Sequence, residues 1–193
     1  MKLVVGLGNP GRRYVGSRHN VGFRVIDELR ARYALGRPRA RFRGELTEAS
    51  LGGEACVSGV RALLLCPRTY MNRSGASVQL ARDFYKLGND QLLVVCDDIN
   101  LPVARLRFRA RGSSGGQKGM ADVIQRLGSD DFARLRIGIG QPREGGDAAD
   151  YVLSRFFDDE SELIEQAIHR AGQAVRDWCC EGTEYCMNQY NAA

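Results

Sequence analysis

The chain has 193 residues, of which 44% are hydrophobic and 26% are charged, and its formal net charge is +5. This length suits one domain with a sizeable core, and the absence of 18 consecutive apolar residues excludes a membrane-spanning helix. The six cysteines form no Cys-x-x-Cys pair and no metal-ligand spacing with His19 or His169, so we expect no zinc site and a reduced, cytoplasmic compartment.

The first 20 residues join a strand to a glycine-rich turn. The apolar run at residues 3–5 leads into the pattern Gly-x-Gly-x-x-Gly at residues 6–11. After a strand, this pattern is typical of dinucleotide binding. The polar side chains of Asn9, Tyr14 and His19 in the same stretch are instead typical of a hydrolytic site.

Apolar residues at helical spacing predict a helix over 21–33, with Asn20 as its N-cap. A dinucleotide-binding turn requires the helix to begin within the glycine motif, where its N-terminal amides meet the pyrophosphate. Here Pro10, Gly16 and a polar run separate the motif from the helix. The late start of the helix therefore disfavours dinucleotide binding.

The segment between residues 35 and 87 is predicted to form strands followed by a helix. Alternating arginines at 37, 39, 41 and 43 are interpreted as a solvated loop. The predicted elements are a hairpin of strands 44–51 and 55–60 joined by Gly52 and Gly53, an apolar strand 62–66, and a helix 74–87.

A continuous apolar run at residues 91–96 is typical of a strand buried on both faces of an α/β sheet. Asp97 and Asp98 follow it directly. Ligands of open α/β sheets bind outside the carboxyl ends of the strands, so these two carboxylates are candidate site residues. Ordinary turn formation or helix capping by aspartate is an equally acceptable explanation for such a pair.

Residues 105–111 alternate arginine with other residues, which on a strand would place four guanidinium groups on one face. Such a face suits phosphate recognition, and a charged edge strand that deters aggregation is the alternative. The arginine excess is general, since only three of the 28 cationic residues are lysine. A glycine-rich loop follows at 112–119, and it lacks the terminal Ser or Thr of a P-loop.

The rest of the chain is predicted as a helix over 120–127, a strand over 134–140, and helices over 150–157 and 160–181. No internal repeat or domain break is evident. Strands that alternate with helices predict one α/β domain over residues 1–193, and the hairpin requires an antiparallel pair, so the sheet should be mixed.

His19 is the one side chain in the polar, glycine-rich opening that titrates near neutrality. If Asp97 accepts its ring N–H, the carboxylate fixes the tautomer and favours the imidazolium formed when the ring takes a proton. Because no Gly-x-Ser-x-Gly elbow is present, the nucleophile would be water. Asn9 and Asn72 could donate amide N–H groups to a carbonyl or an oxyanion. The pattern predicts hydrolysis of an activated carbonyl compound with a nucleic acid as the leaving group.

Five segments together resemble bacterial-type peptidyl-tRNA hydrolases, in order along nearly the whole chain. They read VGLGNPGRRYVGSRHNVGF, PRTYMNRSG, DDINLP, SSGGQKG and RLRIGIG. Members of this family cleave the ester between a peptide and the ribose of its tRNA. The resemblance implies a monomer with a twisted mixed sheet flanked by helices in three layers, and no cofactor or metal.

The same resemblance assigns roles to individual residues. His19 would activate water, Asp97 would orient it, and Asn9 with Asn72 would hold the peptide and polarise the ester. The residues expected to contact the substrate are Tyr14, Tyr70, Met71, Gly116 and Lys118, together with Arg109 and Arg136 as a clamp on the tRNA 5′-phosphate.

The glycine-rich loop departs from the family pattern. The family usually has Gly-Gly-His-Asn-Gly, and this chain has Lys118 where that asparagine stands. Lysine only donates hydrogen bonds, whereas asparagine also accepts them, so we expect retained activity with altered substrate handling. The alternatives are a non-catalytic RNA-binding or splicing factor on the same scaffold and, third, a dinucleotide-dependent oxidoreductase.

Overall fold

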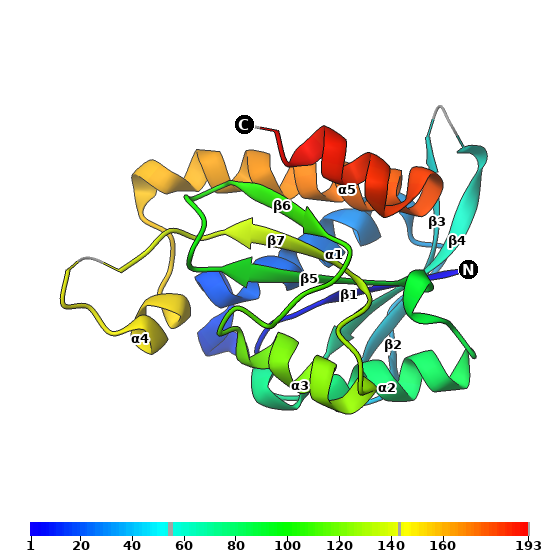
Figure 1. Cartoon of the computed structure of the whole chain (residues 1–193), viewed down its shortest axis with the longest axis horizontal. Coiled ribbons are helices and arrows are strands. Elements are labelled where there is room, and N and C mark those ends of the chain that lie inside the picture. The colour runs from blue at the N-terminus through cyan, green and yellow to red at the C-terminus, as the bar shows by residue number, and fades with distance from the viewer. Residues whose placement is uncertain (54–55, 143, 193) are drawn as a thin grey trace.

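The computed structural model describes residues 1–53, 56–142 and 144–192, and these form a mixed seven-stranded sheet with helices on both faces (Figure 1). The strands are β1 (Lys2–Gly6), β2 (Arg39–Arg41), β3 (Gly44–Gly53), β4 (Cys56–Pro67), β5 (Leu92–Asp98), β6 (Leu106–Arg109) and β7 (Ala133–Gly138). The longer helices are α1 (Val21–Tyr33), α2 (Ser74–Phe84), α3 (Lys118–Leu127), α4 (Ala148–Leu153) and α5 (Asp158–Tyr190).

The strand order is β2-β3-β4-β1-β5-β7-β6. The four central strands, β4, β1, β5 and β7, run parallel, and the pairs β2–β3, β3–β4 and β6–β7 are antiparallel. The carboxyl ends of the parallel strands therefore meet at one edge of the sheet, where α/β folds place their ligands.

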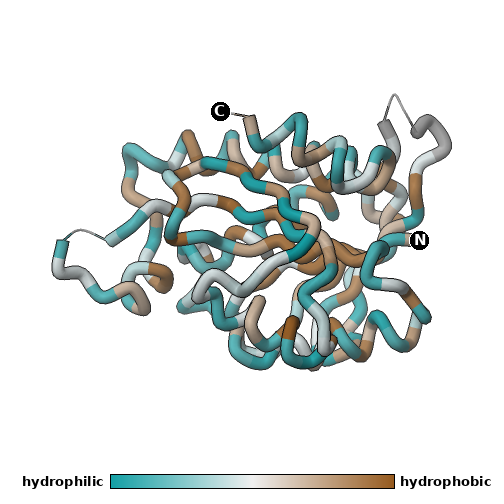
Figure 2. The backbone as a smooth tube through the Cα atoms, viewed as in Figure 1, coloured by the Kyte–Doolittle hydropathy of each residue, from teal (hydrophilic) through white to brown (hydrophobic). Residues whose placement is uncertain are grey.

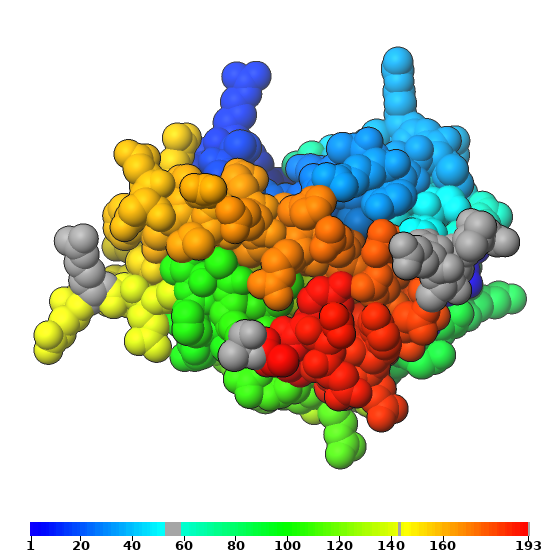
Figure 3. Space-filling model, turned by 90° about the horizontal axis from the view of Figure 1, so that it is seen from above, coloured from blue at the N-terminus to red at the C-terminus, as the bar shows by residue number. Residues whose placement is uncertain are grey.

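Two buried clusters hold the three layers together. One lies between the sheet and helices α1 and α5, and the other lies between the sheet and helices α2 and α3. Hydrophobic residues concentrate on the central strands, while hydrophilic and hydrophobic residues alternate along the outer helices (Figure 2). Helix α5 crosses one whole face of the molecule, beside α1 and β6 (Figure 3). The predicted three-layer mixed α/β fold is confirmed.

Several element boundaries differ from the predictions. Residues 39–41, predicted as a loop, form the edge strand β2, and the two strands predicted on either side of Arg61 are one strand, β4. Arg61 is exposed and pairs with Glu48 on β3 at 2.8 Å, so a charge on the solvent side interrupts the apolar pattern without interrupting the strand. The predicted hairpin exists as β3 and β4, but Gly52 and Gly53, which were predicted to form its turn, are the last two residues of β3, and residues 54 and 55 lie outside the described residues.

The predicted face of four arginines is only partly formed, because β6 spans Leu106–Arg109 and leaves Arg105 and Arg111 outside the strand. Arg105 instead donates a 2.6 Å hydrogen bond to the carbonyl of Asn191 after α5. Helix α2 ends at Phe84, three residues earlier than predicted. Helix α5 extends to Tyr190, past a non-helical residue, Gly182, whose φ of 87° is one that glycine readily adopts.

Helix α1 approaches the sheet unusually closely at its first turn. A Cβ atom on Gly22 would lie 2.5 Å from the carbonyl oxygen of Leu7 and 2.6 Å from that of Val95, both backbone atoms. Only glycine fits between the helix and the ends of β1 and β5. This contact fixes the start of α1, and with it the residues just before the helix, against the carboxyl edge of the sheet.

Candidate active site

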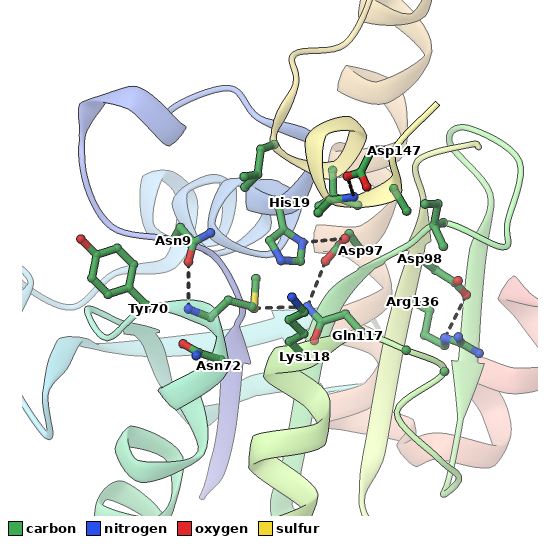
Figure 4. A pocket seen from close by; sticks show the side chains of 18 of the residues that line it. Asn9, His19, Tyr70, Asn72, Asp97, Asp98, Gln117, Lys118, Arg136 and Asp147 are labelled. Carbon is green, nitrogen blue, oxygen red and sulfur yellow. Dashed lines mark hydrogen bonds and ion pairs between the residues drawn. The ribbon is translucent and has the colours of Figure 1, made fainter. Parts of the chain in front are cut away.

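A pocket of about 990 Å³ opens at the carboxyl ends of the parallel strands (Figure 4). Its walls come from the turn after β1, the segment after β4, the end of β5, the start of α3 and the short helix α4. Nine of the eleven predicted site residues line it, namely Asn9, His19, Tyr70, Met71, Asn72, Asp97, Gly116, Lys118 and Arg136. Segments far apart in the chain thus converge on one cavity.

His19 and Asp97 form a hydrogen-bonded pair inside this pocket. His19 belongs to a single 3-10 turn, Arg18–Asn20, that precedes α1, and its Nδ1 lies 2.8 Å from Oδ2 of Asp97. Both side chains are buried, with 8% and 3% exposure. Asp97 accepts at this position, so Nδ1 carries the proton and Nε2 is the ring nitrogen that remains available as a base. Asp97 and Asp98 are the last two residues of β5, whereas we predicted that they would follow the strand.

The turn that contains His19 is held in place by contacts of its neighbour Arg18. This guanidinium is fully buried, donates to the carbonyl of Ile139 at 2.9 Å, and forms an ion pair with Glu160. It also lies over the ring of Tyr151, 4.4 Å from the ring centroid. Because Arg18 ties this turn to the chain after β7, to Tyr151 in α4 and to the start of α5, the position of His19 depends on three separate parts of the fold.

Asn9 is held by hydrogen bonds on both its backbone and its side chain. The amide of Asn20 accepts from the N–H of Asn9 at 2.8 Å and donates to its carbonyl at 3.0 Å. The Oδ1 atom of Asn9 accepts from the N–H of Met71 at 2.8 Å. The remaining amide group, Nδ2, is therefore the donor that Asn9 can offer to a ligand in the pocket.

Asn20 has a different role from the one predicted. It stands at the N-cap position of α1, but its side chain forms no capping hydrogen bond. The side-chain amide of Asn20 instead forms hydrogen bonds with both the N–H and the C=O of Asn9, and Asn20 is buried. Sequence reasoning missed this contact because a helix start preceded by asparagine is the ordinary pattern of a cap.

Gln117 is a second site residue that sequence reasoning missed. It is buried at the N-cap of α3, accepts from the N–H of Met120 through Oε1, and donates from Nε2 to Oδ1 of Asp97 at 3.0 Å. The same nitrogen lies 3.2 Å from Sδ of Met71. A polar residue between a glycine-rich loop and a helix could have indicated the cap, but not the contact with Asp97.

The other pocket side chains are more open to solvent. Tyr70 is 60% exposed at the rim, and Asn72 and Lys118 are exposed as well. Met71 is buried between Asn9 and Gln117. Lys118 is the first residue of α3, directly after Gln117, and it lines the pocket with an exposed side chain.

Two predicted substrate contacts lie outside this pocket lining. Tyr14 is in a short 3-10 turn, Arg12–Tyr14, where its ring lies under the guanidinium of Arg13. Arg109 is at the end of β6, and its guanidinium donates to the carbonyl of Phe108.

Arginines gather on the β6–β7 side of the pocket. Arg136 lines the pocket and is paired with the buried carboxylate of Asp98 at 2.9 Å. Desolvation, followed by the positive charges of Arg107 and Arg136, lowers the pKa of Arg109. Mutual repulsion of this kind is relieved when an anion binds between the cations.

Arg134, on the same strand as Arg136, is buried and forms hydrogen bonds with the glycine-rich loop. Its guanidinium donates to the carbonyls of Gly112, Ser113 and Asp130. The loop that leads to Gln117 is therefore fastened to β7 at its beginning.

Within the described residues, no group of three or more His, Cys, Asp or Glu side chains could hold a metal ion. In the same part of the chain, no helix combines the length and apolar character needed to cross a membrane.

Comparison with known proteins gives a consistent result. The family model for peptidyl-tRNA hydrolase matches residues 3–193. The chain is 50% identical to a peptidyl-tRNA hydrolase of Rhodopirellula baltica, over 100% of this chain and 98% of the relative, and 44% identical to one of Caldanaerobacter subterraneus, over 99% and 100%. It resembles the crystal structure of peptidyl-tRNA hydrolase from Acinetobacter baumannii with a TM-score of 0.88 and 33% identity, covering 100% of this chain and 95% of that one.

Proposed function

The chain belongs to the peptidyl-tRNA hydrolase family and hydrolyses the ester bond of peptidyl-tRNA, and we propose that His19 and Asp97 perform this reaction on a bound water. The observation that carries the proposal is the buried hydrogen bond between Nδ1 of His19 and Asp97 in the wall of the large pocket. Neither the family match nor the relatives favour the alternative of a non-catalytic RNA-binding factor.

The reaction follows from the tautomer that Asp97 selects. Nε2 of His19 takes a proton from water while the water oxygen attacks the ester carbonyl carbon, and Asp97 stabilises the imidazolium that forms. The tetrahedral intermediate then collapses with cleavage of its bond to the ribose oxygen. His19 returns its proton to that oxygen, which releases tRNA with a free hydroxyl and a peptide with a free carboxylic acid, and this acid then loses its proton to solvent.

Asn9 is proposed to hold the carbonyl under attack. Its Oδ1 is occupied by the N–H of Met71, which turns Nδ2 toward the cavity as a donor. A fixed donor at the developing oxyanion is worth about 3 kcal/mol or more of transition-state stabilisation. Asn72, exposed in the same wall, is proposed as a second amide contact to the peptide, and Tyr70 and Met71 as the surface on which that peptide lies.

The nucleic-acid portion is proposed to lie toward β6 and β7. Arg136 and Arg109 would contact a phosphate, and the repulsion among the arginines there supports an anion at this place. Lys118 and Gly116 line the same pocket as Arg136, His19 and Asp97. Lys118 is proposed to contact the terminal nucleotide or the ester, and Tyr14 to contact the peptide from outside the described pocket.

We further propose that the protein acts as a monomer in the cytoplasm. Support comes from Cys66, Cys96, Cys179 and Cys186, which are buried and form no disulfide, as is usual in a reducing compartment.

Hydrolysis of an N-blocked aminoacyl-tRNA tests this mechanism. The wild-type protein should release the amino acid, and His19→Ala should lower kcat by about three orders of magnitude because it removes Nε2, the proposed base. His169→Ala is a matched control, since this second histidine lies on α5 beside Glu28. Normal turnover by His19→Ala would overturn the assignment of the base.

A further inference from the structure

Gln117 has no part in the reaction as described, yet both ends of its side chain are engaged inside the site. Oε1 accepts from the N–H of Met120 at 2.6 Å, and Nε2 donates to Oδ1 of Asp97 at 3.0 Å (Figure 4). Its side chain is buried, with 9% exposure. A residue this deep in the pocket wall calls for a role beyond helix capping.

The two partners of Gln117 allow only one orientation of its amide. The backbone N–H of Met120 can only donate, so it requires the oxygen, and an ionised carboxylate can only accept, so it requires the NH2 group. Rotating the amide by 180° would break both hydrogen bonds. The first turn of α3 therefore aims a donor at Asp97.

As a result, each carboxylate oxygen of Asp97 accepts one hydrogen bond. His19 binds Oδ2 at 2.8 Å, and Gln117 binds Oδ1. With both oxygens engaged, the plane of the carboxylate is fixed, and so is the direction from which it meets Nδ1 of His19. Losing the Gln117 donor would leave the carboxylate free to rotate and would leave a buried oxygen without its partner.

We propose that Gln117 is a positioning residue: it holds the Asp97 carboxylate in the orientation that sets the His19 tautomer. This inference rests on the proposed function, because it assigns Gln117 to the same catalytic pair. It also makes the start of α3 part of the catalytic apparatus, since the N–H of Met120 determines which way the amide points.

Two substitutions separate positioning from capping. Gln117→Glu keeps an oxygen that can accept from Met120, but when ionised it has no donor for Asp97 and adds a like charge. Gln117→His has an acceptor on one ring nitrogen and a donor on the other while it is neutral, so it can serve both partners. Protonation of that new imidazole removes the acceptor.

At pH 8, on N-blocked aminoacyl-tRNA, Gln117→Glu should lower kcat about 10- to 100-fold, with KM within about twofold of wild type. Gln117→His should restore kcat to within about threefold of wild type at pH 8, where a histidine side chain is ordinarily neutral. Gln166→Glu, the same change on an exposed residue of α5, controls for added charge. A wild-type kcat in Gln117→Glu would overturn the proposal.

Nitrogen NMR of the histidine rings tests the proposal without turnover. The chain has only two histidines, so His19→Ala assigns the signals. His19 should be protonated at Nδ1 in the wild type and in Gln117→His, and should become a mixture of tautomers in Gln117→Glu. An unchanged His19 tautomer in folded Gln117→Glu would contradict the positioning role. A wild-type protein that shows these signals but no turnover would contradict the proposed function alone.

Discussion

The pocket residues proposed to act in the reaction are brought together by hydrogen bonds between positions distant in the sequence. His19 and Asp97 are 78 positions apart, and Asn9 and Met71 are 62 apart. One connected set of hydrogen bonds runs from Asn20 through Asn9 to Met71, and from Met71 through Gln117 to Asp97 and His19. Substitution of one of these residues should therefore alter the positions of the residues to which it is hydrogen-bonded.

Asn20→Ala tests the first link of this set. It leaves the buried N–H and C=O of Asn9 without partners, which should lower the free energy of unfolding by about 1–3 kcal/mol and reduce kcat by about tenfold because Asn9 is no longer held. Urea unfolding and kinetics on N-blocked aminoacyl-tRNA measure both effects. Asn89→Ala is the control, because it removes a side-chain hydrogen bond from Arg82 in the 3-10 turn Asn89–Gln91, which does not line the pocket. If Asn20 acted only as a helix cap, the loss of stability would come without a loss of kcat.

Lys118→Asn tests how the exposed cation of Lys118 contributes to binding of the tRNA substrate. Lys118 lies in the pocket wall next to Gln117, so we expect KM for the tRNA substrate to change several-fold while the fold is unaffected, because an exposed side chain contributes little to stability. Kinetics at two salt concentrations measure the change, and a weaker salt dependence in the variant would identify a phosphate contact. Unchanged kcat and KM would remove any role of Lys118 in substrate handling.

The sequence identified the residue types of the site better than their contacts. His19, Asp97 and Asn9 were found because each lies in a polar segment beside a predicted strand. Gln117 and Asn20 were missed because their partners, Asp97 and Asn9, are contacts of the folded chain, and local pattern assigns both residues to helix starts.

At the scale of elements, the proposed catalytic residue His19 is positioned by helix α1, whose first turn packs directly on the backbone of the sheet. Gly22, which lies in α1 three residues after His19, packs on the backbone of Leu7 and Val95. On the other side, Arg18 fastens the same turn to Ile139 and Glu160. His19 therefore sits in a turn that is fixed at both of its ends.

Gly22→Ala should be strongly destabilising, because the new Cβ would lie 2.5–2.6 Å from backbone atoms of Leu7 and Val95. These atoms can move only if the backbone around them moves as well. We expect a loss of about 3 kcal/mol in the free energy of unfolding and a lower kcat as His19 shifts. Gly36→Ala is the matched control, since a Cβ there meets nothing within 4 Å. Equal stability of the two variants in urea would show that the close contact is not required.

The element predictions failed where tertiary pairing overrode local pattern. Strand β2 consists of exposed residues only, and pairing with β3 makes it a strand. Strand β4 continues through Arg61 because β3 pairs with it on both sides of that residue. Central strands such as β5 were predictable because burial on both faces leaves an uninterrupted apolar run.

At the scale of the whole molecule, the two hydrophobic clusters bury ionisable thiols as well as apolar side chains. Burial raises the pKa of Cys66 from 9.0 to about 12, and burial also raises the pKa values of Cys179 and Cys186 to about 12. The folded protein therefore keeps thiol protons at pH values where the unfolded chain releases them. This contribution to stability is fully present below pH 9 and is lost as the pH rises from 9 toward 12.

Cys66→Ala isolates one of these thiols. Between pH 8 and pH 10.5, the wild-type protein should lose about 2 kcal/mol more stability than the variant, even though the variant is less stable at pH 8 because of the smaller side chain. Urea unfolding at both pH values measures the difference. Parallel losses in the two proteins would mean that the Cys66 thiol is not shielded as described.

The most direct test of the account is the single-turnover rate of Asp97→Asn. An asparagine amide can keep the geometry of the carboxylate but donates to Nδ1, so it selects the wrong tautomer of His19. With enzyme in excess over N-blocked aminoacyl-tRNA, the rate of ester cleavage should fall by about 10²–10⁴, while the Kd for uncharged tRNA stays within about twofold of wild type. A cleavage rate near that of the wild type would contradict the claim that the His19–Asp97 pair activates the water.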